Sequence, residues 1–268
     1  MRERVVVKWG GGLITEKHAM KTVRHEVLAS LADQIDECLS AGVDVILVHG
    51  AGSFGHLKAK QYQLAEGKLD GTIFSGDMTQ EEAVEAVRQD MRELNGHVME
   101  ALTRLDISAV SLSPHTWVRN TGPNFDGDLS LFEEAPKGIV VVTHGDVVDC
   151  DVGSFGILSG DDLVVRLANE ISGVHRLVFA MGGVEGVLAS PPNDEADDVL
   201  LETLGREQLF EGEHASEMDV TGGIGLKVNR GFLVAEKGVE VLLVSGEHEH
   251  RVTDACLGRP VVGTKLVA

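Results

Sequence analysis

Cysteines are few and scattered in this chain. The 268 residues contain three, Cys38, Cys150 and Cys256, with no CxxC pair. An odd, dispersed set disfavours a disulfide framework or a zinc site, and is typical of reduced intracellular thiols. No apolar run approaches the roughly 20 residues of a membrane span, and residues 1–4 lead into a short strand without the apolar core of a signal peptide. We therefore expect a cytoplasmic protein.

Positive charge is also scarce. Lysine and arginine number 23 against 43 acidic residues, giving a net charge of −20. This balance disfavours a nucleic-acid partner, which needs a basic surface, and adhesion to an anionic membrane. Whether the acidity reflects a salty cytoplasm stays open. Hydrophobic residues make up 43% of the chain, which is enough for one large domain or two lobes.

Short apolar runs alternate with amphipathic segments along the chain, which predicts an α/β fold with a mostly parallel sheet and helices on both faces. A soft boundary between two lobes is expected near 147–156, and 191–195 is expected to be a polar surface loop. The expected strands are Val5–Val7, Val45–Val48, Ile107–Leu112, Ile139–Thr143, Leu177–Ala180 and Val239–Val244, and the expected helices are Val23–Ala41, Gln80–Leu105, Asp161–Glu170 and Leu226–Lys237.

The segment Val43–His56 is the most informative, because a buried strand runs into a glycine loop that ends in His56. Glycines after a strand let backbone N–H groups surround an anion, and the following helix directs its positive end there. The letters GAGSFG also fit a dinucleotide fingerprint, but that motif needs an acidic residue at the end of a second strand about 20 positions on. Asp70 ends no predicted strand, so a phosphate site is favoured over a nicotinamide site.

Two further glycine-rich turns carry lysines. Lys8 ends the first predicted strand before the glycines at 10–12, and Lys17 follows shortly after. The segment 219–228 leads through glycines into a helix that opens with Lys227. A lysine beside bare amide groups binds phosphate as a point charge. Each segment taken alone is equally compatible with a glycine turn and a solvated lysine.

Other segments refine the hypothesis. The glycine loop 182–186 follows a predicted strand and is expected to border a nucleotide, whereas no Walker A sequence occurs. Asp161 is interpreted as holding lysine ammonium groups, with a helix cap as the alternative, and Asp162 as a cap or a solvated residue. The His-Glu-His run at 248–250 is interpreted as a solvated loop, because no third metal ligand is evident.

Several of these segments occur in the same order in the amino acid kinase superfamily, which the chain resembles. The Ser-Phe-Gly-His letters make it most similar to the isopentenyl phosphate kinase branch, and not to the carboxylate kinases. The matching motifs are Lys-x-Gly-Gly-Gly at 8–12, Ile-Thr-Glu-Lys at 14–17, His-Gly-Ala-Gly-Ser-Phe-Gly-His at 49–56, Gly-Asp-Val-Val at 145–148, Ser-Gly-Asp-Asp at 159–162 and Thr-Gly-Gly-x-x-x-Lys at 221–227.

The resemblance implies an open αβα sandwich, with an acceptor lobe and dimer face at about 1–150 and a nucleotide lobe at about 151–268. It implies a homodimer that moves the γ-phosphoryl group of ATP, bound with Mg²⁺, to isopentenyl monophosphate. The implied catalytic residues are Lys8, Lys17, Asp161 and Lys227, the substrate-binding residues Ala51, Gly52, Gly55, His56 and Gly156, and the nucleotide-binding residues Gly10, Gly11, Gly182, Gly186, Gly222, Gly223 and Lys227.

The chain departs from the family pattern at three places. Gly12 stands where a serine is more common, Ala51 where a glycine is usual, and 182–186 where Thr-Asp-Val-Asp-Gly is usual. The altered loop at 182–186 leaves the nucleotide preference open, and the segment between Leu69 and Met78, which does not match the family pattern, leaves the organic part of the acceptor open. Candidates for an apolar acceptor pocket, which equally suit an ordinary core, are Phe54, Phe74, Met78, Val84, Val87, Met91 and Leu94.

Two alternative functions remain. A kinase of the same fold acting on another small phosphate, a phosphonate such as fosfomycin, or a carboxylate is one, and His56 favours a phosphate or phosphonate. A non-catalytic protein that binds an oxyanion or other ligand is the second. Retention of Lys8, Lys17, Asp161 and Lys227 disfavours it, because a storage protein needs no clamp on a transferring phosphoryl group.

Overall fold

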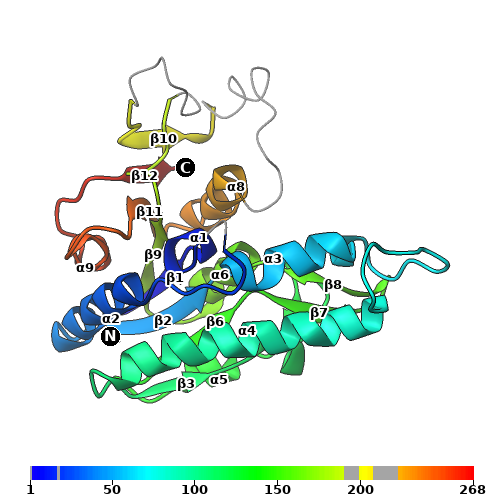
Figure 1. Cartoon of the computed structure of the whole chain (residues 1–268). Coiled ribbons are helices and arrows are strands. Elements are labelled where there is room, and N and C mark those ends of the chain that lie inside the picture. The colour runs from blue at the N-terminus through cyan, green and yellow to red at the C-terminus, as the bar shows by residue number, and fades with distance from the viewer. Residues whose placement is uncertain (1, 17–18, 190–198, 208–222) are drawn as a thin grey trace.

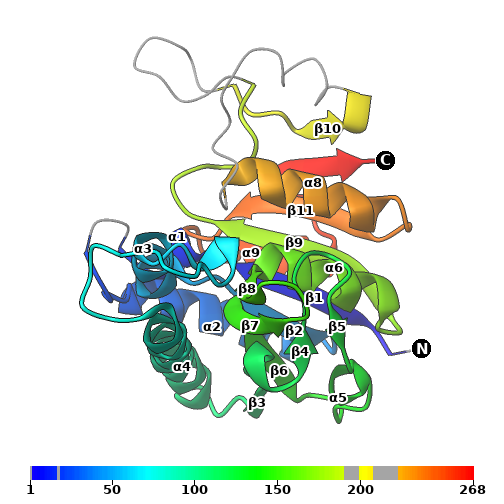
Figure 2. The ribbon, with the colours of Figure 1, turned by 90° about the vertical axis from the view of Figure 1, so that its right-hand side faces the viewer.

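The computed structural model describes residues 2–16, 19–189, 199–207 and 223–268. Its main feature is a sheet that crosses the molecule from β10 at the top of Figures 1 and 2 to β3 near the bottom. All neighbouring pairs are parallel except β11–β12. The strands in spatial order are β10 (Thr203–Gly205), β12 (Thr264–Val267), β11 (Glu240–Ser245), β9 (Val174–Met181), β1 (Arg4–Trp9), β2 (Asp44–His49), β6 (Val140–His144) and β3 (Ala109–Ser111).

Helices cover both faces of this sheet. Val5 and Val7 pack with α2 residues in one core, whereas Val6 packs with α6 and α8 residues in the other. This alternation follows from the two-residue period of a strand. The predicted αβα sandwich is therefore confirmed. The helices are α1 (Gly11–Ile14), α2 (His25–Ser40), α3 (Gly52–Gln61), α4 (Gln80–Thr103), α5 (Ser130–Glu133), α6 (Gly160–Glu170), α8 (Ile224–Ala235) and α9 (Arg251–Leu257), with short 3₁₀ helices η1 (Leu64–Glu66) and η2 (Pro114–Thr116).

A small second sheet was not expected from the sequence. Its strands in spatial order are β5 (Asp126–Gly127), β4 (Val118–Arg119), β7 (Asp146–Cys150) and β8 (Ser154–Leu158). The segment 147–156, where a boundary between lobes was expected, forms the antiparallel β7–β8 hairpin. The division into an acceptor lobe and a nucleotide lobe stays a prediction.

The carboxyl ends of the central strands bring four glycines together. β1, β2, β6 and β9 each end at the residue before a glycine, namely Gly10, Gly50, Gly145 and Gly182. Because these strands are parallel, the four glycines lie at one edge of the sheet, where open α/β folds bind ligands. Among the described residues, no helix is long and apolar enough to cross a membrane. The loop expected at 191–195 lies outside the described residues.

Candidate active site

A cavity of about 730 Å³ lies at the carboxyl edge of the large sheet. It combines charged side chains, glycine turns and two apolar regions. The charged lining comes from Lys8, Asp146, Asp161 and Lys227, and the glycine turns supply Gly10, Gly11, Gly12, Gly50, Gly55, Gly145, Gly160, Gly182, Gly186 and Gly223. One apolar region contains Val87, Met91, Val147 and Ile157, and the other Val184, Val187, Leu201, Leu204, Ile224 and Val228.

A buried carboxylate links the two lysines. Asp161 Oδ1 lies 2.8 Å from Lys8 Nζ, and Asp161 Oδ2 lies 3.2 Å from Lys227 Nζ. Lys8 comes from the end of β1, Asp161 from the first turn of α6 and Lys227 from the first turn of α8. The predicted contact of Asp161 with lysine ammonium groups is therefore confirmed, and its role in the reaction stays a prediction.

The triad holds opposite charges in a desolvated place. Burial is the largest cause that lowers the pKa of Lys8, to about 8; the nearby Lys227 lowers it further, whereas Asp161 raises it. Burial raises the pKa of Asp161, but Lys8 and Lys227 together lower it more, so the net shift is downward. Two cations against one carboxylate leave an excess positive charge that suits an anionic ligand.

The glycine turns pack backbone against backbone. A Cβ on Gly11 would lie 2.2 Å from the nitrogen of Gly52, and a Cβ on Gly50 would lie 2.6 Å from the nitrogen of Gly11. Gly52 also adopts a φ of +51°, which side-chain-bearing residues rarely tolerate. The starts of α1 and α3 can therefore meet only because glycine occupies these positions.

The amides of the first turn are not all available to a ligand. The N–H of Gly10 donates to the carbonyl of Ala180 at 2.9 Å, so this amide is already paired, and a contact of Gly10 with a phosphate stays a prediction. Gly10 instead fixes the turn that leads into α1. Gly11 begins that helix, and N–H groups in the first turn of a helix lack intrahelical acceptors.

The loop after β2 forms the start of α3. Ala51 is the N-cap residue of that helix, and Ala51, Gly55 and His56 line the cavity, whereas Gly52 lies behind them against Gly11 and Thr15. The side chain of His56 is exposed on the cavity wall. Partial desolvation is the largest cause that lowers its pKa, followed by the charges of Lys8 and Lys227. At neutral pH a neutral imidazole there can still donate one hydrogen bond.

The loop after β9 lines the second apolar region. Gly182 and Gly186 reach the cavity, as does Gly223 at the start of α8. The N–H of Gly183 donates to Glu247 Oε2 at 3.0 Å, which fixes the loop from the side of β11. Lys17 and Gly222, also predicted for the site, lie outside the described residues.

Three expectations need correction. Gly156 lies in β8 opposite Val148, and a Cβ there would meet Thr121 and Cys150; it does not line the cavity. Ser159 is the N-cap of α6, so Asp162 is not the cap, and Asp162 is not solvated, because it is buried and pairs with Arg230 at 2.7 Å. Of the apolar pocket candidates, Val87 and Met91 line the cavity, and those that do not are Phe54, Phe74, Met78, Val84 and Leu94.

Two buried histidines behind the glycine turns were missed. His49 and His144 end β2 and β6 side by side, with ring centroids 5.1 Å apart. Burial is the main cause that lowers both pKa values, that of His49 to about 3. His49 Nε2 is bonded to Asn95 Oδ1 at 3.2 Å. His49 opens the motif at 49–56, and its place at a strand end next to Gly50 was the available signal.

Acidic and imidazole groups do not gather as they would around a metal. Among the described residues, no three His, Cys, Asp or Glu side chains are placed to hold an ion together. His248 instead contacts Glu185 at 2.7 Å, and His250 contacts Glu37 at 2.8 Å. The cations that line the cavity are Lys8 and Lys227.

Known proteins resemble this chain over most of its length. The model of the amino acid kinase family matches residues 3–245. The chain is 30% identical to an isopentenyl phosphate kinase of Methanothermobacter thermautotrophicus over 98% of both chains, and 31% identical to one of Thermoplasma acidophilum over 93% of this chain and 95% of the relative. An X-ray structure of isopentenyl phosphate kinase superposes with a TM-score of 0.82 at 27% identity, covering 99% of this chain and 100% of that one.

These matches extend over nearly the whole chain and confirm the resemblance deduced from the motifs. The family implies a phosphotransferase that uses ATP. The cavity geometry agrees, since it joins a cationic centre to apolar regions on either side. The chain belongs to the amino acid kinase family.

Proposed function

We propose that this protein transfers the γ-phosphoryl group of ATP to isopentenyl monophosphate, giving isopentenyl diphosphate and ADP. The observation that carries the proposal is the buried Lys8–Asp161–Lys227 triad between two apolar regions of one cavity. The names of the relatives, which match over most of their length, supply the acceptor.

In this proposal the two lysines neutralise charge that builds up between donor and acceptor. An oxygen of the acceptor phosphate attacks the γ-phosphorus, and the bond from that phosphorus to the β–γ bridging oxygen breaks, leaving ADP. A phosphate monoester has a second pKa near 6, so the attacking oxygen is already anionic at neutral pH and needs no general base. Catalysis then rests on positioning and electrostatic stabilisation.

The two apolar regions suit the two substrates. His56, Ala51 and Gly55 would hold the acceptor phosphate, with Val87 and Met91 beside its organic group. Gly182, Gly186, Gly223 and the aliphatic side chains around them would hold the nucleotide. Lys17 and Gly222 keep their predicted roles beside the phosphates, as proposals from the motif.

Magnesium fits this arrangement as a companion of the triphosphate. Mg²⁺ keeps several waters and is commonly held by substrate phosphates with few protein carboxylates. Asp161 lines the cavity, and both its oxygens face lysines. The ion would supply further neutralisation of the transferring group.

We also propose a cytoplasmic homodimer. The three cysteines are free thiols, in keeping with a reducing compartment. Association through residues 1–150 rests on the family resemblance, and light scattering on the purified protein measures it. A mass of one chain, 28.6 kDa, would rule it out.

An acceptor panel tests the activity. ADP release is measured with ATP and Mg²⁺ on isopentenyl phosphate, dimethylallyl phosphate, fosfomycin, mevalonate phosphate and N-acetylglutamate. The proposal expects the highest kcat/KM for isopentenyl phosphate. Turnover with another member alone would keep the kinase and change its substrate, and ATP binding without turnover would favour a binding protein.

A further inference from the structure

Two elements from different layers face each other across the proposed acceptor end of the cavity. Val87 and Met91 of α4 form one wall, and Gly145 and Val147 at β7 form the other. Gly55 sits beside them, since a Cβ there would lie 3.4 Å from Met91 Sδ. The separation between α4 and β7 therefore sets how wide an organic group can be beside His56.

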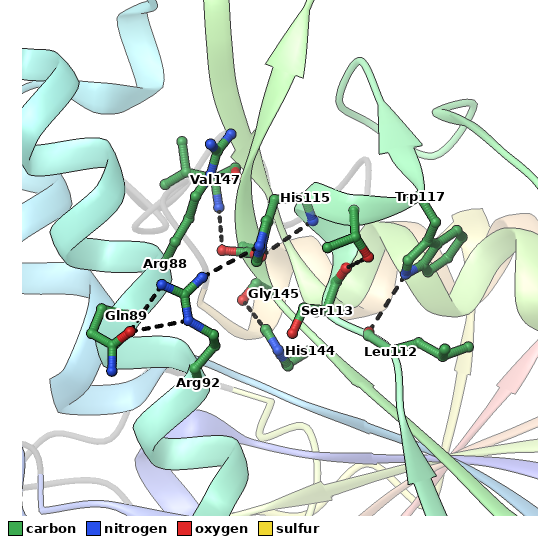
Figure 3. Close-up of polar contacts among 12 residues, drawn as sticks. Arg88, Gln89, Arg92, Leu112, Ser113, His115, Trp117, His144, Gly145 and Val147 are labelled. Atoms are coloured by element: carbon green, nitrogen blue, oxygen red, sulfur yellow. Dashed lines mark hydrogen bonds and ion pairs between the residues drawn. The ribbon is translucent and has the colours of Figure 1, made fainter.

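Arg88 joins the two walls directly. Its Nε donates to the carbonyl oxygen of Val147 at 2.9 Å, and its Nη2 contacts Asp149 Oδ1 at 2.8 Å. The Arg88 side chain is only 16% exposed, so it lies along the protein surface rather than in solvent. Figure 3 shows it reaching from α4 to the backbone of β7.

Arg92 makes a second, relayed connection one turn further along α4. Its Nη1 lies 3.3 Å from His115 Nε2 (Figure 3). His115 Nδ1 in turn lies 2.7 Å from Asp146 Oδ2. A guanidinium can only donate, so His115 Nε2 accepts and the ring proton is on Nδ1, directed at Asp146. The Asp146 side chain is fully buried, and its Oδ1 accepts from the N–H of Val147 at 2.9 Å.

The spacing along α4 couples these bonds to the cavity wall. Val87 and Met91 are four residues apart, and each is followed by one of the two arginines. Residues four apart share one face of a helix, and the next position lies about 100° round the axis. The same two turns that present apolar groups to the cavity are thus tied to β7 on their flank.

We propose that Arg88, Arg92, His115 and Asp146, the α4–β7 clasp, are positioning residues that fix the width of the acceptor end and so restrict the acceptor to a short organic group. Of these four residues Asp146 also lines the cavity, and the proposed role of the clasp is to hold the cavity wall, not to act on the reacting atoms. The inference rests on the proposed function, because it concerns the acceptor of that reaction.

Variants of the clasp test the inference. Arg88→Met and Arg92→Met each remove one connection and keep an apolar stem. Arg104→Met is the matched control, because Arg104 follows α4 directly, is 66% exposed and, within the part of the chain that the structure describes, forms an ion pair only with Glu100 one turn earlier. For each protein, kcat and KM are measured with isopentenyl phosphate, with the longer geranyl phosphate and with ATP.

The expected result is a rise of about tenfold in the ratio of kcat/KM for geranyl phosphate to that for isopentenyl phosphate in both clasp variants. KM for ATP should stay within about twofold of wild type, and Arg88→Lys, whose ammonium can still donate to Val147, should restore part of the preference. A general loss of folding would instead lower the apparent kcat with both acceptors by the same factor and leave the KM values and the acceptor ratio unchanged.

Unchanged acceptor ratios in Arg88→Met and Arg92→Met, equal to those of Arg104→Met, would overturn the inference. If Arg88→Met does not fold, Arg92→Met decides, because it leaves the Arg88 bond to Val147 in place. The wild type separates the two proposals. No turnover of isopentenyl phosphate by the wild type refutes the proposed function, whereas turnover with an unmoved ratio refutes only the clasp.

Discussion

Asp161 holds its carboxylate 2.8 Å from the ammonium nitrogen of Lys8, and both side chains are at most 5% exposed. A buried carboxylate between cations keeps them in place only while it is charged. Asp161→Asn should therefore lower kcat by about a hundredfold or more, in steady-state assays of ADP release. A folded Asp161→Asn variant with kcat within a few-fold of wild type would remove the triad from the mechanism.

The lowered pKa of Lys8 predicts a pH limit on nucleotide capture. The free enzyme holds Lys8 charged below about pH 8 and neutral above it. Since kcat/KM reports the free enzyme, kcat/KM for ATP should fall as the pH rises through about 8. In Lys8→Arg the fall should move to higher pH, because guanidinium stays charged. An identical profile in Lys8→Arg would assign the limit to another group.

Much of the triad could be predicted because each member lies beside a readable local signal. Lys8 ends an apolar strand, Asp161 starts a helix after Ser159, and Lys227 follows a glycine turn. Parallel strands and helix starts gather at one sheet edge, so such residues converge even when far apart in sequence.

The second sheet and the α4–β7 clasp could not be predicted in the same way. β4 and β5 contain two residues each, too short for a hydrophobic period. His115 and Asp146 are 31 residues apart, and neither lies in a pattern that marks the other as its partner. The prediction that Gly156 binds substrate was wrong, because a glycine within a strand can also mark a place where neighbouring side chains leave no room for a Cβ. Here those neighbours are Thr121 and Cys150.

Gly11 tests the close approach of the two glycine turns. In Gly11→Ala the new Cβ would lie 2.2 Å from the nitrogen of Gly52, so the turns must separate. A shift of about 1 Å at such a site can lower turnover about a hundredfold. Gly96→Ala on α4 is the control, because a Cβ there meets nothing within 4 Å. Equal kcat in both variants would contradict the packing argument.

His56 is predicted to act on the acceptor rather than on the nucleotide. His56→Ala should lower kcat/KM for isopentenyl phosphate by about tenfold or more while KM for ATP stays near wild type, because one donor to the phosphate is lost. His56→Gln, which keeps an N–H donor, should recover part of the loss. An effect confined to KM for ATP would move His56 to the nucleotide end.

The buried His49 is expected to make the folding stability of the protein sensitive to acid. The pKa of His49 is about 3 in the folded protein and 6.5 for an unburied imidazole, as in the unfolded chain. Between these two pH values only the unfolded chain takes up the proton. The contribution of neutral His49 to the free energy of unfolding is fully present above about pH 6.5. It is lost as the pH falls toward 3, by up to about 1.4 kcal/mol per pH unit. In His49→Gln, chemical denaturation over this range should show a shallower slope. An unchanged slope would assign the acid sensitivity elsewhere.

The central claim is transfer of a phosphoryl group from ATP to the phosphate of isopentenyl phosphate. The most direct measurement is ³¹P NMR of the wild-type protein with ATP, Mg²⁺ and isopentenyl phosphate. The account predicts loss of the monophosphate signal and the appearance of two coupled signals of an organic diphosphate together with ADP. ADP accompanied by inorganic phosphate, with the monophosphate signal intact, would contradict it.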